Sequence, residues 1–94
     1  MYTHVVLFKV KDKQDIPFFV ETLRSMEGKI AELKGLEVGI NDIESERNYD
    51  IVLISRHDSK EAMLAYQKSD YHHNEVLPKI KPLFEVNKAV DFES

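Results

Sequence analysis

The sequence predicts a small α+β domain, in which strands and helices follow one another in the order strand, helix, strand, strand, helix, helix, strand. Two observations support this prediction. Four segments are rich in β-branched and aromatic residues that alternate with a period of two, whereas three segments repeat apolar residues every three or four positions. The chain has 94 residues and no linker or internal repeat, which predicts a single domain over residues 1–94.

Residues 3–10 form the first predicted strand. Alternation places His4, Val6 and Phe8 on one face and residues such as Val5 on the other, so that both faces are mainly apolar. A strand of this kind has to be covered on both sides. Helices of the same chain can cover one face, and a different partner has to cover the other.

A long amphipathic helix is predicted over residues 16–33, where Pro17 suits the first turn. Gly28 weakens this helix, which we expect to fray or bend there, and Gly35 is a typical stop signal. The apolar stripe that would face the sheet consists of Ile16, Phe19, Val20, Leu23, Met26, Ile30 and Leu33.

Two further strands are predicted over residues 36–43 and 49–55, joined by a polar and acidic hairpin loop. Gly39 lies inside the earlier of these strands, which indicates either a bulge or a close approach of another chain segment to the backbone. The later strand is apolar on both faces, like the first strand of the chain.

The last third of the chain predicts two helical pieces and a closing strand. Asp58 and Glu61 have the spacing of a capping box before a short helix that ends near residues 69–70. A further helical piece over residues 74–84 and a strand over residues 86–92 complete the domain. The economical arrangement is a ferredoxin-like, four-stranded antiparallel sheet with helices on one face.

One apolar face of this sheet is left without a cover in a single subunit. A large exposed apolar face indicates an interface, and a chain this short gains burial by association. We therefore expect a homodimer in which two sheets pack face to face and form a dimeric α/β barrel.

Composition argues against several classes of partner. The chain carries 13 basic and 17 acidic residues, a net charge of −4 that opposes binding to nucleic acids and to anionic membrane surfaces. It has no cysteine, no apolar run of about 20 residues and no signal-peptide pattern at its start. We expect a cytoplasmic protein that binds neither nucleic acid nor membrane.

We also expect neither a metal nor a cofactor. His72 and His73 are adjacent, so their side chains point in different directions, and no third strong ligand follows them at helical spacing. The three glycines are scattered and form no phosphate-binding loop. His57 follows Arg56 at a predicted strand end and is expected to be solvated.

The order and spacing of several segments resemble the stress-responsive A/B barrel (Dabb) family over nearly the whole chain. The matching positions are residues 4–10, 36–39, 49–53 and 64–66, then His72 and residues 90–92. The resemblance implies a dimeric α+β barrel with an association to stress. It implies no reaction, because most members of the family are small proteins without an assigned activity.

One branch of the family consists of polyketide cyclases, which close a ring by an aldol-type reaction without a cofactor. The resemblance to that branch implies a catalytic pair of a tyrosine and a histidine six residues later, a spacing that Tyr66 and His72 match. His4 matches a histidine near the first strand. The chain departs from the family at Ser69, where a histidine is common, and from the cyclase branch at Ile51, where that branch has another histidine.

The predicted pair meets only if the helix stops between its members, because six residues on an unbroken helix turn through about 600°. The short polar residues Ser69 and Asp70 predict such a stop. His72 would then act as a base on a carbon acid, and Tyr66 would donate a hydrogen bond to the oxygen that gains charge. The alternative is structural: Tyr66 is a core aromatic residue, and His72 ties the turn to backbone carbonyls.

A ligand pocket is the second candidate site, with the predicted lining His4, Val6, Phe8, Phe19 and Leu53. The alternative is that these residues are plain core and that His4 bonds to a neighbouring strand. Three interpretations of function stay open at this point. The chain is a homodimer of unassigned activity that binds a small apolar molecule, a cofactor-free cyclase-like enzyme, or an assembly module.

Overall fold

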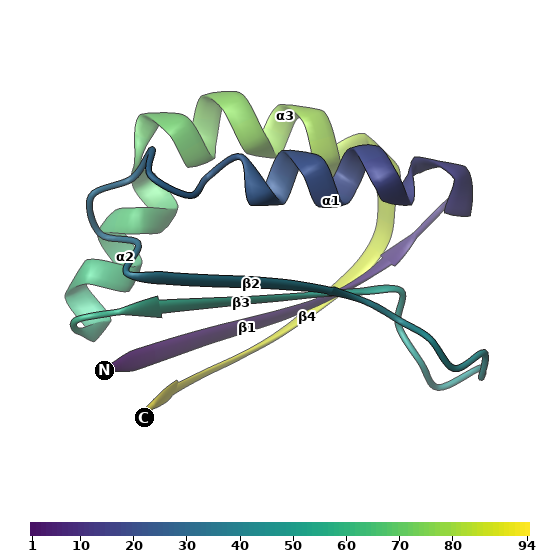
Figure 1. The fold of residues 1–94 in the computed structure, drawn as a ribbon, viewed down its shortest axis with the longest axis horizontal. Helices are drawn as coiled ribbons and strands as arrows, with labels where there is room; N and C mark the ends of the chain where they lie inside the picture. The colour runs from purple at the N-terminus through teal and green to yellow at the C-terminus, as the bar shows by residue number, and fades with distance from the viewer.

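The computed structural model describes all 94 residues, which form one antiparallel sheet with helices on one face (Figure 1). The sheet has the strand order β2-β3-β1-β4, and each neighbouring pair is antiparallel. This confirms the predicted α+β, ferredoxin-like class. The strands are β1 (Tyr2–Val10), β2 (Gly35–Ile40), β3 (Ile51–His57) and β4 (Phe84–Glu93).

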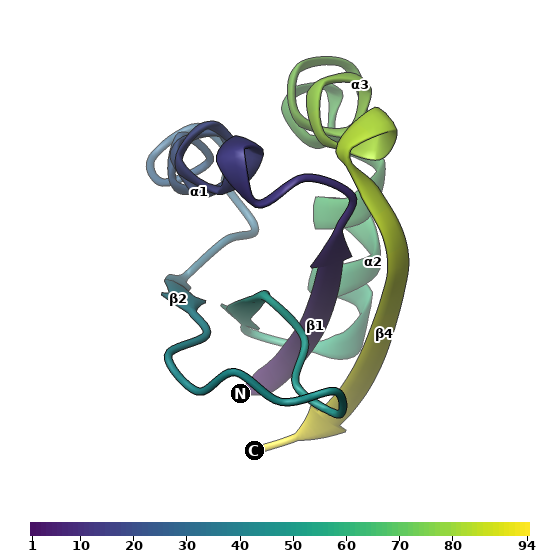
Figure 2. The same cartoon turned by 90° about the vertical axis from the view of Figure 1, so that its right-hand side faces the viewer.

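Helices α1 (Ile16–Arg24) and α3 (Leu77–Ile80) lie side by side above the sheet, α2 (Lys60–Lys68) descends toward one end of it, and no element covers the opposite face (Figure 2). A short 3-10 turn, η1 (Lys13–Asp15), leads into α1. After α2, an almost continuous helical segment runs over η2 (Tyr71–Val76), α3 and η3 (Lys81–Leu83). None of these helices is long and apolar enough to cross a membrane.

Helix α1 is shorter than the sequence predicts, and the expectation of a helix as far as residue 33 is wrong. The chain leaves the helix after Arg24 and continues in tight turns, within which Gly28 adopts a φ of 78°, a value that other residues rarely reach. Ile30 is nevertheless buried and Leu33 packs against the core. The apolar stripe therefore covers the sheet although the helical geometry ends early.

Gly39 allows β2 and β3 to approach each other closely. A Cβ atom at this position would lie 3.0 Å from Cγ1 of Val52, its partner across the two strands. The second of the two alternatives for Gly39, a close approach to the backbone, therefore describes this position. Ordinary carbon contacts are wider, so a larger residue would push the strands apart.

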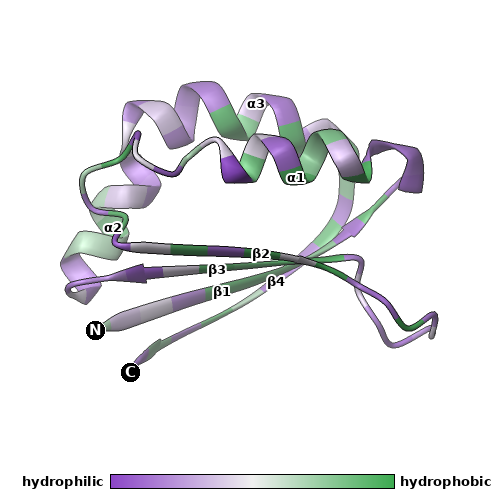
Figure 3. Ribbon diagram, viewed as in Figure 1, coloured by the Kyte–Doolittle hydropathy of each residue, from purple (hydrophilic) through white to green (hydrophobic).

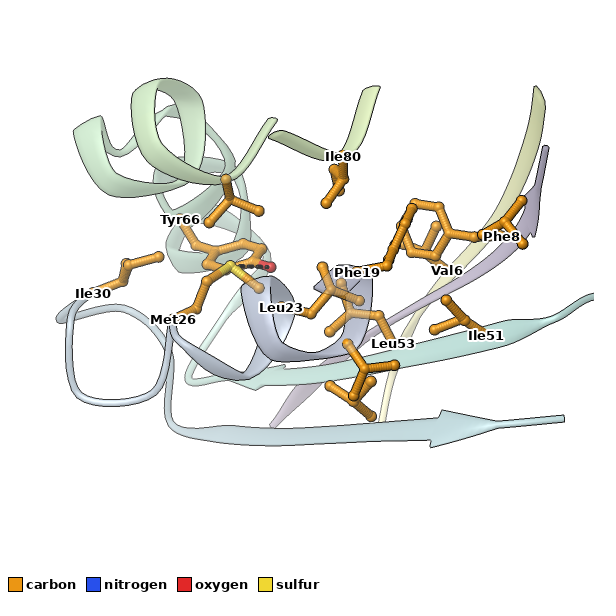
Figure 4. Close-up of a cluster of buried hydrophobic side chains, with 14 residues drawn as sticks. Val6, Phe8, Phe19, Leu23, Met26, Ile30, Ile51, Leu53, Tyr66 and Ile80 are labelled. Atoms are coloured by element: carbon orange, nitrogen blue, oxygen red, sulfur yellow. Dashed lines mark hydrogen bonds between the residues drawn. The ribbon is translucent and has the colours of Figure 1, made fainter. Parts of the chain in front are cut away.

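The hydrophobic core lies between the sheet and the helices (Figure 4). Even-numbered residues of β1, including Val6 and Phe8, point into it. Phe8 packs edge-on against Phe19 and Phe84, with ring centroids 4.9 and 5.3 Å apart. This aromatic cluster joins β1, α1 and the start of β4, and so fixes the helical layer on one half of the sheet.

The other face of the sheet is apolar and open to solvent. Leu7 is 38% exposed, Val90 is 64% exposed and Phe92 is 44% exposed. In Figure 3 hydrophobic colour alternates with hydrophilic colour along β1 and β2, and the helices lie on only one side of these strands. We refer to this surface as the open face; its apolar members on β1, β3 and β4 are Val5, Leu7, Val52, Ile54, Val86, Val90 and Phe92.

Candidate functional site

A cavity of about 200 Å³ lies between β1, β4 and the helical segment formed by η2 and α3. Most of its wall is apolar, and Val6, Phe8 and Leu53 form its floor on the sheet side. Val76 and Ile80 close it from the helical side. The cavity therefore occupies a gap in the core, between residues that the sequence placed on the inner faces of the strands.

Strand β4 forms the open edge of this cavity. Its residues Asn87 and Ala89 line the cavity and are exposed, since β4 is the last strand of the sheet and no element lies beyond it. They pair across the strands with Phe8 and Val6, which form the floor. A ligand would therefore enter along β4 and reach an apolar interior.

Few polar side chains line the cavity, and two of them are histidines. His4 comes from β1 and His72 comes from η2, so segments far apart in the sequence meet here. Gln67 and Asn87 are the other polar residues of the lining. An apolar wall with a few convergent polar groups is typical of small-molecule sites.

His4 is held by a carboxylate. The sheet register places it opposite Asp91 on β4, and its Nδ1 atom forms a hydrogen bond with Oδ1 of Asp91. An ionised carboxylate only accepts hydrogen bonds, so Nδ1 carries the proton and donates it. In the neutral ring Nε2 then carries a lone pair, and no side chain or backbone group of the protein bonds to it.

Tyr66 and His72 are brought together by an interruption of the helix. Helix α2 ends at Lys68, and Ser69 adopts an extended conformation with φ −60° and ψ 150°. The chain then turns into the wide helix η2, in which the backbone N–H of His72 donates to Oγ of Ser69 at 3.3 Å. The two rings lie edge-on, with centroids 4.9 Å apart. The interruption of the helix allows them to meet, as the sequence predicts.

The hydroxyl group of Tyr66 is directed away from the cavity. Tyr66 is fully buried and its hydroxyl donates to Sδ of Met26 at 3.6 Å, which Figure 4 shows as a dashed line. Burial raises the pKa of Tyr66 to about 12. In this conformation the ring supports His72 from behind, and the hydroxyl does not line the cavity.

Phe19 also lies behind the cavity wall. It is fully buried and packs edge-on against Phe8, which separates it from the cavity. Of the five residues predicted to form the pocket, His4, Val6, Phe8 and Leu53 line the cavity.

The surroundings of His72 favour the neutral form of its imidazole. Desolvation by burial lowers its pKa, and the nearby ring of His4 lowers it further because two charged rings would repel each other. Its Nδ1 atom is buried and has no hydrogen-bond partner in the protein. A buried polar atom without a partner is uncommon in a folded core, and the backbone of Gln67, which raises the pKa of His72, lies close to this ring.

His57 is fully buried, and the expectation that it is solvated is wrong. Its Nδ1–H donates to the carbonyl oxygen of Glu32 at 2.7 Å, and its Nε2 accepts from Oγ of Ser55 at 2.9 Å. Desolvation lowers the pKa of His57. The sequence held a signal for this burial, since position 57 continues the inward alternation of Leu53 and Ser55 along β3.

Three imidazole rings surround the ring of Tyr66. His57 lies 4.7 Å from it, His72 lies 4.9 Å from it and His4 lies 6.3 Å from it, between ring centroids. His73, by contrast, is exposed and its Nδ1 faces Oδ1 of the neighbouring Asn74 at 3.3 Å. No three histidine, aspartate or glutamate side chains gather in a group that could hold a metal ion.

A comparison with known protein families shows to which family this chain belongs. The profile described as the stress responsive A/B barrel domain, Dabb, matches residues 2–94. The chain belongs to the Dabb family. No curated protein sequence matches it significantly.

Solved structures agree with this assignment at the level of the fold. A protein from Bacteroides fragilis, described as dimeric, ferredoxin-like and of unknown function, superposes with a TM-score of 0.84 at 24% identity, over 99% of this Dabb chain and 95% of its own. A dimeric ferredoxin-like protein of unknown function from Thermobifida fusca gives 0.85 at 25% identity, over 99% and 90%. A hydroxynitrile lyase from Passiflora edulis gives 0.81 at 14% identity, over 97% and 90%.

Two histidines with lowered pKa values predict that acid destabilises the protein. His57 and His72 both have lowered pKa values in the folded state, so the unfolded chain binds more protons than the folded one. Their contribution to stability is complete above about pH 6.5, the ordinary histidine pKa, and declines as the pH falls below it. Urea denaturation between pH 7.5 and pH 5 measures this decline.

The control for this prediction compares two replacements. His57→Gln should flatten the decline below pH 6.5, whereas His73→Gln, which alters an exposed ring, should leave the decline as steep as in the wild type. A wild-type protein whose free energy of unfolding does not fall between pH 6.5 and pH 5 would contradict the assigned burial of these rings.

Proposed function

We propose that the protein is a homodimer whose subunits pack through their open faces, and that each subunit binds one small, mainly apolar molecule in its cavity. The observation that carries the proposal is the cavity of about 200 Å³ itself. An engineered, apolar cavity of about 150 Å³ in another protein binds benzene. The space in this protein therefore suits a single ring with a short substituent.

The character of the lining supports an apolar ligand. The floor of Val6, Phe8 and Leu53 offers no hydrogen-bonding side chain, so a strongly polar molecule would lose its hydration there without compensation. The histidines His4 and His72 supply the polar contacts of the lining near the core. This division into an apolar body and a polar end predicts an amphipathic ligand.

The open face supports the dimer. Its residues on β1 and β4, such as Leu7, Val90 and Phe92, lie side by side across two neighbouring strands and remain exposed in the single subunit. A contiguous apolar surface of this kind is uncommon on a monomeric protein. The descriptions of two structural neighbours, from Bacteroides fragilis and Thermobifida fusca, call those proteins dimeric.

Ligand binding is tested with a small aromatic probe such as 4-ethylphenol. At a free concentration one hundred times its Kd, such a probe should stabilise the protein by about 2.7 kcal/mol, because it binds the folded state alone. Ala89→Phe, which puts a large side chain at the cavity edge, should abolish this gain. Lys79→Phe, at an exposed position on α3, should retain it; thermal denaturation with and without probe provides the comparison.

The dimer is tested by sedimentation equilibrium at micromolar concentration. Val90→Asp places a charge in the open face and should give a folded monomer, since burying an unpaired carboxylate between two sheets is unfavourable. Phe18→Asp changes an exposed residue on α1, in the helical layer, and should leave the dimer intact. A wild-type protein that sediments as a stable monomer would contradict the dimer.

A second candidate function is supported by the position of His72 in the lining of the cavity. A neutral histidine in an apolar cavity can accept a proton from a carbon acid, as in a cofactor-free, aldol-type ring closure of a linear polyketide. Tyr66 would have to turn its hydroxyl from Met26 toward the cavity to act as hydrogen-bond donor. The hydroxynitrile lyase among the structural neighbours is an enzyme with a similar fold.

For this second candidate, His72→Ala should reduce the rate of cyclisation of a linear β-polyketone at least about a hundredfold, the usual size of a general-base effect. His73→Ala, which removes the adjacent exposed ring, is the matched control and should leave the rate unchanged. Sedimentation and circular dichroism have to show that both variants remain folded dimers. Equal rates in the wild type and in folded His72→Ala would remove His72 from the mechanism.

A further inference from the structure

We propose that Asp91 and His4 together form a hydrogen-bond acceptor site in the cavity, which selects apolar ligands that carry a hydroxyl group. The proposal rests on the proposed binding of a small molecule in this cavity and adds the chemical group that is recognised there. It concerns the cross-strand pair of β1 and β4, and it assigns a role to Asp91, which does not itself line the cavity.

The tautomer of His4 is set by its partner. Asp91 lies directly opposite His4 in the antiparallel register, and its carboxylate oxygen can only accept a hydrogen bond. The proton of the neutral ring therefore resides on Nδ1, and the lone pair resides on Nε2. Without this partner the ring would be free to exchange its proton between the two nitrogens.

No group of the protein satisfies the lone pair of His4. The side chain is only 7% exposed, whereas the side chain of Asp91 is 36% exposed and reaches solvent. Nε2 forms no hydrogen bond with any group of the protein, including the neighbouring ring of Tyr66. Because His4 lines the cavity, solvent reaches this nitrogen in the empty cavity, and a molecule bound there would displace that solvent and have to supply the donor.

This geometry discriminates between ligands of nearly equal size. A hydroxyl group can donate to Nε2 of His4 and satisfy it. A methyl group or an ether oxygen at the same place cannot donate, and it would leave the nitrogen desolvated and unpaired. The ligand class is thus a small apolar molecule, such as a substituted single ring of a size suited to about 200 Å³, with a hydroxyl group at one end.

Three probes of similar shape test the selection on the wild-type protein. 4-Ethylphenol has the donor, 4-ethyltoluene replaces the hydroxyl by a methyl group, and 4-ethylanisole keeps the oxygen without its proton. Calorimetric titration should give a Kd for 4-ethylphenol about tenfold lower than for either of the others, as one additional hydrogen bond predicts. Equal affinities would overturn this inference and leave the proposed cavity function standing, whereas no binding of any probe would overturn both.

Variants then separate the positioning role of Asp91 from a general effect of charge. Asp91→Ala should reduce the preference for 4-ethylphenol to within about twofold while 4-ethyltoluene binds as before. Glu93→Ala removes a carboxylate two residues further along the same strand and should keep the tenfold preference. A preference that survives in Asp91→Ala would overturn the role of Asp91.

The tautomer itself is observable in the wild type, so the inference does not depend on whether a variant folds. Nitrogen-15 NMR of the His4 ring at pH 8 should show a protonated Nδ1 and an unprotonated Nε2. In folded Asp91→Ala the signals should move toward those of an exchanging ring. A wild-type spectrum with the proton on Nε2 would overturn the proposal.

Discussion

The antiparallel register of β1 between β3 and β4 is the constraint on which the rest of the structure depends. It places Ser55, His4 and Asp91 in one row across three strands, on the face that the helices cover. Side chains alternate between the two faces of a strand, so a slip of one residue between β1 and β4 would turn Asp91 to the open face. The histidine on β1 would then lose the carboxylate that holds its ring beside the cavity.

The same register separates the two halves of the inner face. Toward one end of β1, Phe8 meets Phe19 and Phe84 in an edge-on cluster without hydrogen-bonding groups. Toward the other end, His4 and the buried His57 approach Tyr66. The cavity spans the boundary between these halves, which explains why its floor is apolar and why its two histidines lie near Tyr66 at one end.

The interruption of the helix after α2 completes the polar end. An unbroken helix would carry His72 away from Tyr66, and the extended residue Ser69 redirects the chain so that the two rings meet. Ser69 also caps the following turn through its hydroxyl group. A serine in place of the histidine common in the Dabb family is therefore compatible with this turn and with the position of His72.

Much of the architecture could be predicted from the periodicities alone. The order of strands and helices along the chain, the inward face of β1 and the stop after α2 follow from local patterns that tertiary contacts do not override. The early end of α1 shows the limit, since the stripe that includes Ile30 continues through turns as well as through a helix, and burial does not distinguish the two. His57 shows another limit. The charged Arg56 beside it indicated a solvated strand end, whereas the alternation along β3 places the side chain of His57 inside.

The sequence by itself determined the fold class, the two-sided apolar strands and the membership in a family, because these depend on patterns that repeat along the chain. Only the tertiary structure decided that His4 pairs with Asp91, that the Tyr66 hydroxyl bonds to Met26 and that a cavity remains beside His72. The physical reason is the separation of the contacting residues along the sequence. These two hydrogen bonds join residues that lie 87 and 40 positions apart in the sequence, and they depend on strand register and on side-chain packing, which no local spacing encodes.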